Sequence, residues 1–293
     1  MRRSGLSTGC NLAAVECMKG EAERLEIRVP VCHSRGALPP WRHACRIIQK
    51  RSMLKKPRQR SLEKRATENP AFLFDLDGTL MDTVYQHVLA WREALEIAGI
   101  ELSVWRIHRR IGMSGGLFVN ALLRETGHQL TKEEAIQLQR LHAKAYGRLV
   151  NQVRPLPGAR ELLAYLSDAK VPWAIATSGR MESAGPALKI LGVDLKKTTV
   201  ITRDLVQYAK PNPDLFIAAA DKLGVHIGSS VVVGDSVWDL LAARRAAALG
   251  IGLLSGGYGR DELEKAGAYR VYHDPADMLQ HLDEVGVRRA ESV

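Results

Sequence analysis

Cysteine is confined to the first part of this 293-residue chain, and long apolar runs are missing throughout. The four cysteines, Cys10, Cys17, Cys32 and Cys45, lack the paired spacing of a zinc site. No run approaches the roughly 18 apolar residues of a membrane span, and no apolar signal-peptide core follows Met1. We therefore expect no membrane partner, and the cysteine-free remainder fits a reducing cytoplasmic location.

Excess charge of one sign is also missing once the first 69 residues are set aside. That leader holds 16 Lys or Arg against 6 Asp or Glu, which accounts for the whole net charge of +10, and the rest holds 26 of each. Because nucleic acids bind basic surfaces, only the leader is a candidate for such binding. Nucleic acid is not an expected partner of the remainder.

The leader, residues 1–69, shows no sustained helix or strand period. Three interpretations remain open: a disordered basic tail, an Arg-rich organelle-targeting peptide, or upstream sequence read from a start codon placed too early. Glu16, Glu21, Glu23 and Glu26 argue against a targeting peptide, which is poor in acids. We favour a disordered or spurious extension.

From Ala71 onward, apolar strands alternate with helical patterns. Strands are predicted at 71–74, 172–177, 199–201, 230–234, 251–254 and 269–272, and helices include 158–169, 213–223 and 236–248. Continuous apolar strands separated by helices predict an α/β fold. This fold is a Rossmann-like parallel sheet with helices on both faces.

A helical block interrupts this alternation after the first strand. It opens with a helix that Thr83 caps and Gly99 ends, and Gly112–Gly116 breaks the block in the middle. We expect residues 84–155 to form an alpha-helical cap over the carboxyl edge of the sheet. Residues 70–83 and 156–293 would then form the core domain.

The most informative segment is Asp75-Leu76-Asp77-Gly78-Thr79-Leu80-Met81-Asp82-Thr83, directly after the first strand. Two carboxylates two residues apart, followed by a glycine turn, gather acceptor oxygens where a ligand can approach. Carboxylate, phosphate and water oxygens suit the octahedral shell of Mg²⁺ better than zinc. The segment therefore predicts a magnesium site, with a plain Asp-rich turn as the alternative.

Three more polar groups fall at later strand ends or in the loops beyond them. Thr177-Ser178-Gly179 offers hydroxyls and a flexible backbone for phosphate oxygens. Lys210, beside the prolines at 211 and 213, offers a cation that neutralises a phosphate and an attacking carboxylate together. Asp235 ends a predicted strand, and Asp239 follows four residues later.

In this order, the motifs DLDGT, ATS, KP and GDSxxD resemble those of the haloacid dehalogenase-like (HAD) hydrolases, over about residues 72–282. The helical insert is similar to the small alpha-helical cap of one subclass, which includes phosphoglycolate phosphatase-like enzymes. The resemblance implies Mg²⁺-dependent hydrolysis of a small phosphate monoester.

The resemblance also implies roles for individual residues. Asp75 is expected to attack phosphorus and form an aspartyl-phosphate, and Asp77 to protonate the leaving oxygen and later deprotonate water. The Asp75 carboxylate, the Asp77 backbone carbonyl and the Asp235 carboxylate are expected to hold Mg²⁺. Asp239 is expected to orient Lys210 or a metal-bound water. The phosphate is expected to bind Thr177, Ser178, Gly179 and Lys210.

Other chemistries of the family remain open, because one fold hosts several reactions. The dehalogenases lack an acid at the place of Asp77, and no lysine lies in the central cap where a phosphonatase would need one. His87, followed by Ala90-Trp91, resembles the first cap helix of the beta-phosphoglucomutases. Against a mutase, the cap loop of those enzymes carries an arginine where this chain has Gly115. A sugar-phosphate mutase and a non-catalytic phosphate-binding protein stay as alternatives.

Substrate contacts in the cap are expected from Arg109, Arg110 and Ser114, which border or lie within the Gly112–Gly116 break. A plain helix-to-helix turn is the equal alternative for that loop. Neither the identity of the ester nor the oligomeric state is predicted by the sequence.

Removing residues 1–68 tests whether the leader contributes to hydrolysis. Because every motif lies beyond residue 70, a chain that starts at Asn69 should release phosphate from p-nitrophenyl phosphate at the rate of the full chain. It should also lose any affinity for a DNA duplex that the basic leader confers. Phosphate release and a DNA-retention assay measure the two properties separately, and loss of hydrolysis would contradict this division.

Overall fold

The computed structural model describes residues 12–15, 27–30, 70–127 and 130–287, and the chain divides into units 1–66 and 67–293. In the first unit, β1 (Leu12–Val15) pairs antiparallel with β2 (Ile27–Pro30), two short strands that periodicity did not predict. Most of the leader lies outside the described residues, so the expectation of a disordered or spurious extension stays a prediction.

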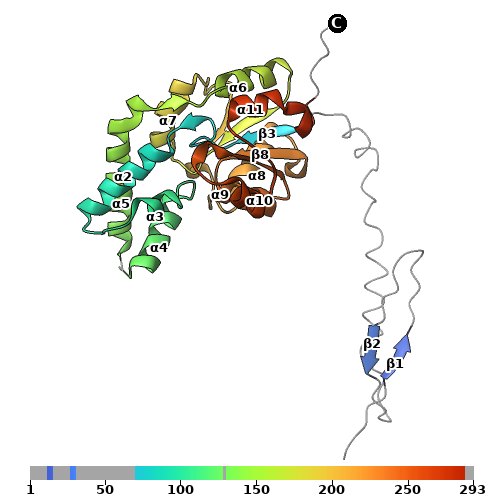
Figure 1. Cartoon of the computed structure of the whole chain (residues 1–293). Helices are drawn as coiled ribbons and strands as arrows, with labels where there is room; N and C mark the ends of the chain where they lie inside the picture. The colour runs from blue at the N-terminus through green and yellow to red at the C-terminus, as the bar shows by residue number, and fades with distance from the viewer. Residues whose placement is uncertain (1–11, 16–26, 31–69, 128–129, 288–293) are drawn as a thin grey trace, which may run out of the picture. The chain divides into compact units, whose positions relative to one another are not determined.

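A six-stranded sheet forms the centre of the second unit (Figure 1). Its strand order is β10-β9-β8-β3-β6-β7, and every neighbouring pair is parallel. The strands are β3 (Ala71–Phe74), β6 (Trp173–Ala176), β7 (Thr199–Ile201), β8 (Ser230–Gly234), β9 (Leu249–Leu253) and β10 (Ala268–Tyr272). The predicted α/β fold with a parallel sheet is confirmed.

Helices cover both faces of the sheet because successive side chains of a strand point to opposite faces. Phe72 and Phe74 pack with α6 (Ala159–Asp168), α7 (Met181–Leu191) and α11 (Pro275–Gln280). Leu73 packs with α8 (Asp214–Leu223) and α9 (Val237–Arg245). Figure 1 shows α6 and α11 on one side of β3 and β8, with α8 and α9 on the other. Burial of each such side chain is worth about 1.5–3 kcal/mol.

The remaining core elements are short. Helix α10 (Arg260–Ala266) packs its Leu263 with Leu240 of α9 and Val271 of β10. The 3₁₀ turns are η3 (Val150–Gln152), η4 (Arg203–Leu205), η5 (Ile227–Ser229), η6 (Leu254–Gly256) and η7 (Leu282–Val285).

Two elements have a boundary that differs by more than one residue from the sequence prediction. Strand β9 begins at Leu249, which pairs with Val231 of β8, and Leu254 starts the η6 turn instead of ending the strand. Helix α9 ends at Arg245, because Ala247 adopts a φ of +56° that stops the helix before the predicted end at Ala248.

The cap consists of α2 (Val84–Ile97), α3 (Val104–His108), α4 (Gly115–Thr126) and α5 (Lys132–Leu149). Helix α2 runs beside α5 (Figure 1). Val88, Trp91 and Phe118 belong to an apolar cluster of the cap's own. The chain leaves the core through β4 (Met81–Asp82) and returns through β5 (Arg154–Pro155), which pair antiparallel. The exact domain boundaries at 84 and 155 stay a prediction.

None of the helices in the described part of the chain combines the length and the apolar character that crossing a membrane requires.

Gly158 begins α6 where this helix packs against α11. Its φ is +72°, and an added Cβ would lie 2.4 Å from the Ala276 Cα. Gly158→Ala should lower the free energy of unfolding by more than about 2 kcal/mol, because the left-handed backbone alone costs about 1 kcal/mol and a backbone atom cannot rotate away. Urea denaturation measures the loss.

Gly99→Ala is the matched control, since Gly99 has a φ of +71° and nothing within 4 Å of an added Cβ. This control should lose only about 1 kcal/mol. Equal losses at the two positions would contradict the close packing of α6 on α11.

Candidate active site

The carboxyl ends of four adjacent strands, β8, β3, β6 and β7, lie at one edge of the sheet. Asp235 follows β8, Asp75 follows β3, Thr177 follows β6, and Arg203 stands two residues after β7. Lys210 comes later in the connection from β7 to α8. Because parallel strands end at the same edge, side chains distant in the sequence converge there.

Three carboxylates and one ammonium group are buried together at this edge. The Lys210 Nζ contacts Asp75 Oδ1 and lies 2.8 Å from Asp239 Oδ1. Asp75, Asp235 and Asp239 each present an oxygen within 4.8 Å of the others, and all four residues are 3% exposed or less. Because negative charge exceeds positive charge in this cluster, the donor set fits a divalent cation.

Asp239 has both of its oxygens engaged. One oxygen faces Lys210, and the other accepts hydrogen bonds from the Ser236 Oγ at 2.6 Å and the Ser236 N–H at 3.1 Å. These contacts leave Asp75 and Asp235 as the more available carboxylates for a metal ion.

Two threonine hydroxyls of the segment 75–83 hold acids of the site, which the sequence reasoning missed. The Thr79 Oγ1 donates to Asp235 Oδ1 at 3.0 Å, and the Thr83 Oγ1 donates to Asp77 Oδ1 at 2.7 Å. Thr83 does precede α2, but its side chain makes no capping hydrogen bond. The prediction of a side-chain cap was wrong because the hydroxyl is directed to the carboxylate. The signal that could have predicted these contacts is that both threonines lie within the same nine-residue segment as Asp75 and Asp77.

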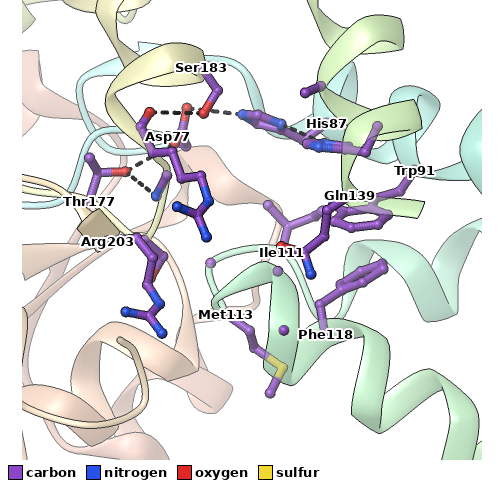
Figure 2. A pocket seen from close by; sticks show the side chains of 18 of the residues that line it. Asp77, His87, Trp91, Ile111, Met113, Phe118, Gln139, Thr177, Ser183 and Arg203 are labelled. Atoms are coloured by element: carbon purple, nitrogen blue, oxygen red, sulfur yellow. Dashed lines mark hydrogen bonds and ion pairs between the residues drawn. The ribbon is translucent and has the colours of Figure 1, made fainter. Parts of the chain in front are cut away.

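Asp77 connects the core to the cap through two histidines (Figure 2). His87 Nε2 of α2 lies 3.3 Å from Asp77 Oδ1, and His87 Nδ1 lies 3.1 Å from His142 Nε2 of α5. Tyr146 stacks on His87 with ring centroids 3.9 Å apart. The sequence analysis used His87 only in the comparison with the mutases, and no pattern pointed to His142, which is 55 residues away.

Burial dominates the protonation of the acids at the centre. It raises the pKa of Asp75 to about 7, although the neighbouring Lys210 opposes this rise. Burial, with the nearby charges of Asp239 and Asp75, also raises the pKa of Asp235 well above its ordinary value. Both acids therefore hold protons more strongly than an exposed aspartate.

Asp77 and Lys210 are dominated by their partners instead. Burial alone would raise the pKa of Asp77, but His87 and a hydrogen bond from Thr83 outweigh it and keep that pKa below the usual value. Burial would lower the pKa of Lys210, but Asp239 and Asp75 outweigh it and raise that pKa. Lys210 is therefore cationic.

The Thr177-Ser178-Gly179 loop lines a cavity of about 330 Å³ between the core and the cap (Figure 2). The Gly179 N–H donates to the Thr177 Oγ1 at 3.0 Å, and the Thr177 hydroxyl lies 3.4 Å from Asp77 Oδ2. The Ser178 Oγ is buried without a hydrogen-bond partner among the described residues. A buried hydroxyl is costly without a partner, so Ser178 fits a site for an incoming acceptor such as a phosphate oxygen.

The opposite wall of the cavity belongs to the cap and is largely apolar. Trp91, Ile111, Met113 and Phe118 line it together with Gln139 (Figure 2). The glycines of the loop at 112–116 also line the cavity, so this loop borders the site and is more than a connection between helices.

Of the three cap residues predicted to contact substrate, Arg110 lines the cavity. Its guanidinium pairs with Glu125 and donates to the Arg106 carbonyl oxygen at 2.7 Å. Ser114 is absent from the cavity lining of the described chain, because it is buried with its Oγ 3.4 Å from the Leu117 N–H at the start of α4.

Arg109 also does not reach the cavity. Its Nη1 donates to Glu262 Oε2 at 3.1 Å, and its guanidinium lies 4.2 Å from the centroid of the Tyr258 ring. The sequence placed Arg109 next to the loop, but its partners on the core draw the side chain to another surface. This arginine joins the cap to the core and does not line the cavity.

Comparisons with known proteins agree with this geometry. A family model described as haloacid dehalogenase-like hydrolase matches residues 70–247. A crystal structure of a hydrolase from Pseudomonas syringae is 56% identical, with a TM-score of 0.73, and the match covers 74% of this chain and all of that one. The phosphoglycolate phosphatase of Agrobacterium fabrum is 30% identical over 64% of this chain and 82% of the relative. Hexitol phosphatase A of Escherichia coli is 33% identical over 60% of this chain and 78% of the relative.

Cation binding at the buried carboxylates should depend on pH. Below pH 7, Asp75 carries a proton that a cation must displace, and the raised pKa of Asp235 acts in the same direction. The dissociation constant for Mg²⁺ should therefore rise about tenfold per pH unit below pH 7 for each proton displaced. Calorimetric titration at pH 6, 7 and 8 measures it, and a constant affinity over this range would contradict the raised pKa values.

Proposed function

Because the chain belongs to the haloacid dehalogenase-like hydrolases, we propose that it is a Mg²⁺-dependent phosphatase that cleaves a small phosphate monoester through an aspartyl-phosphate on Asp75. The observation that carries the proposal is the buried cluster of Asp75, Asp235, Asp239 and Lys210 beside the cavity between core and cap. The names of the phosphatase relatives support a phosphorylated metabolite as the substrate.

In the proposed reaction, Asp75 acts as the nucleophile. It lines the cavity, and its contact with Lys210 fixes the position of the carboxylate. A carboxylate oxygen attacks phosphorus, a new bond forms between that oxygen and phosphorus, and the bond from phosphorus to the ester oxygen breaks. The electron pair of the broken bond remains on the leaving oxygen.

Asp77 is the proposed proton carrier. It gives a proton to the leaving oxygen in the first step. In the second step it takes a proton from water, whose oxygen attacks phosphorus; the bond from phosphorus to the Asp75 oxygen breaks, which releases inorganic phosphate and restores Asp75. His87 and Thr83 keep its pKa low in the free protein. A bound phosphate opposes this effect, because a nearby negative charge favours the protonated acid.

The phosphate would be held by Thr177, Ser178, the backbone of Gly179 and Lys210, which neutralises charge as it develops. Mg²⁺ would be bound by the carboxylates of Asp75 and Asp235 and the backbone carbonyl of Asp77. When bound, it supplies positive charge that makes phosphorus a better electrophile. Asp239 acts through Lys210, which it contacts at 2.8 Å.

The contacts of Arg110 favour hydrolysis over a mutase reaction. A mutase must hold a second phosphate with the cap, and the arginine that lines the cavity from the cap is engaged by Glu125 and the Arg106 carbonyl. A released phosphate is also what separates a phosphatase from a non-catalytic phosphate-binding protein.

Asp75→Asn tests the nucleophile directly. Phosphate release from p-nitrophenyl phosphate with Mg²⁺ should fall at least about 10³-fold, because an amide cannot replace the attacking carboxylate. Asp77→Asn should lower kcat about 10²- to 10⁴-fold through loss of proton transfer. Asp168→Asn, at the exposed end of α6, is the matched control and should keep full activity. An Asp75→Asn variant with normal turnover, or a wild-type protein without turnover, would refute the proposal.

A further inference from the structure

Arg203 lines the same cavity as Asp75 and the phosphate loop, but the proposed reaction does not use it. It is the first residue of η4, two residues beyond β7, and its side chain is partly buried. Figure 2 shows it on the core side of the cavity, across from Trp91 and Phe118 of the cap. It therefore stands where the alcohol part of an ester would lie, between the phosphate loop and the cap.

The backbone fixes Arg203 to the phosphate loop. Its N–H donates to the Gly179 carbonyl oxygen at 2.9 Å, and its Nη1 donates to the Val206 carbonyl oxygen at 2.6 Å. One guanidinium N–H is thus used to hold the side chain in place, and the remaining donors are available to a ligand. A cation held in this way loses little conformational entropy when it binds an anion.

Among the described residues, Arg203 has no acidic partner in an ion pair. Arg110 pairs with Glu125, and Arg180 pairs with Asp204 at 2.6 Å. Asp204, the neighbour of Arg203 in the chain, is occupied by Arg180 and by the Met181 N–H. Among the arginines lining the cavity, Arg203 is the one for which no carboxylate partner is found in the described part of the chain.

We infer that Arg203 binds a second anionic group of the substrate, so that the preferred ester is a small phosphomonoester whose alcohol part carries a carboxylate or another phosphate. This inference rests on the proposed function and adds the substrate class. The cavity of about 330 Å³ lies at the small end of the range for ligand sites, which favours a compact alcohol part. Glu182 also lines the cavity but is exposed, so solvent screens its charge.

A matched set of esters tests the inference. Phosphoglycolate, 2-hydroxyethyl phosphate and ethylene glycol bisphosphate share a two-carbon frame and differ in the second group, which is a carboxylate, a neutral hydroxyl or a phosphate. The wild-type protein should show a kcat/KM at least about tenfold higher for one or both charged esters than for 2-hydroxyethyl phosphate, since a charged hydrogen-bonded pair contributes this much or more.

Arg203→Gln should remove that preference. Its kcat/KM for the preferred charged ester should fall about tenfold to a hundredfold, mainly through KM, while that for 2-hydroxyethyl phosphate and p-nitrophenyl phosphate stays within about threefold. Arg140→Gln, which replaces an exposed arginine of α5 outside the cavity lining, is the control and should keep the preference.

The outcomes separate this inference from the proposed function. If no ester is hydrolysed, the proposed function fails. If all three two-carbon esters are hydrolysed equally well by the wild-type protein, the proposed function stands and the inference fails, whether or not the variant folds. An equal loss on charged and neutral esters in Arg203→Gln would also overturn it, because Arg203 would then act on the transferred phosphate.

Discussion

The buried ammonium group of Lys210, between the carboxylates of Asp75 and Asp239, is the interaction on which the candidate site depends. Charges removed from water are tolerated only when each is compensated, and here three carboxylates share one lysine. Burial and the excess of negative charge both raise the pKa of Asp75 and Asp235. The excess of negative charge is also the reason that a divalent cation fits the cluster. The same excess of negative charge that makes the site costly without a ligand makes it receptive to a divalent cation.

The cavity has two walls with different physical character, and the chain builds them from different segments. Strand ends of the core supply the charged and hydroxyl groups, because parallel strands deliver their following residues to one edge. Helices α2 and α4 of the cap, with the loop at 112–116, supply most of the apolar wall. Asp77 joins the walls through His87 and His142, so an acid of the core is positioned partly by packing in the cap. In the proposed reaction, proton transfer by Asp77 and the position of the cap are thus physically linked.

A single connection, from β7 to α8, carries Lys210, proposed to take part in the reaction, and Arg203, proposed to select the substrate. Lys210 enters the carboxylate cluster, whereas Arg203 lines the cavity next to the phosphate loop. A substitution of Arg203 in η4 should therefore alter the proposed substrate selectivity without disturbing the carboxylates. Among the described residues, Arg203 is held by Gly179 and Val206 and makes none of the ion pairs of the cluster. This separation suits a fold on which many substrates are handled by one chemistry.

The sequence by itself determined the parallel α/β fold and the order of the motifs at its strand ends, because apolar runs and the polar residues that follow them are local patterns. The helices named from the sequence did not include α7, which holds Pro186 inside it while Ala184, Ala187 and Leu188 pack on the sheet. Only the tertiary structure decided that Arg109 is drawn to Glu262, that His87 meets His142, and that Arg203 lines the cavity. Those outcomes depend on how the cap packs on the core, and contacts between residues so distant in the chain leave no periodicity in the sequence.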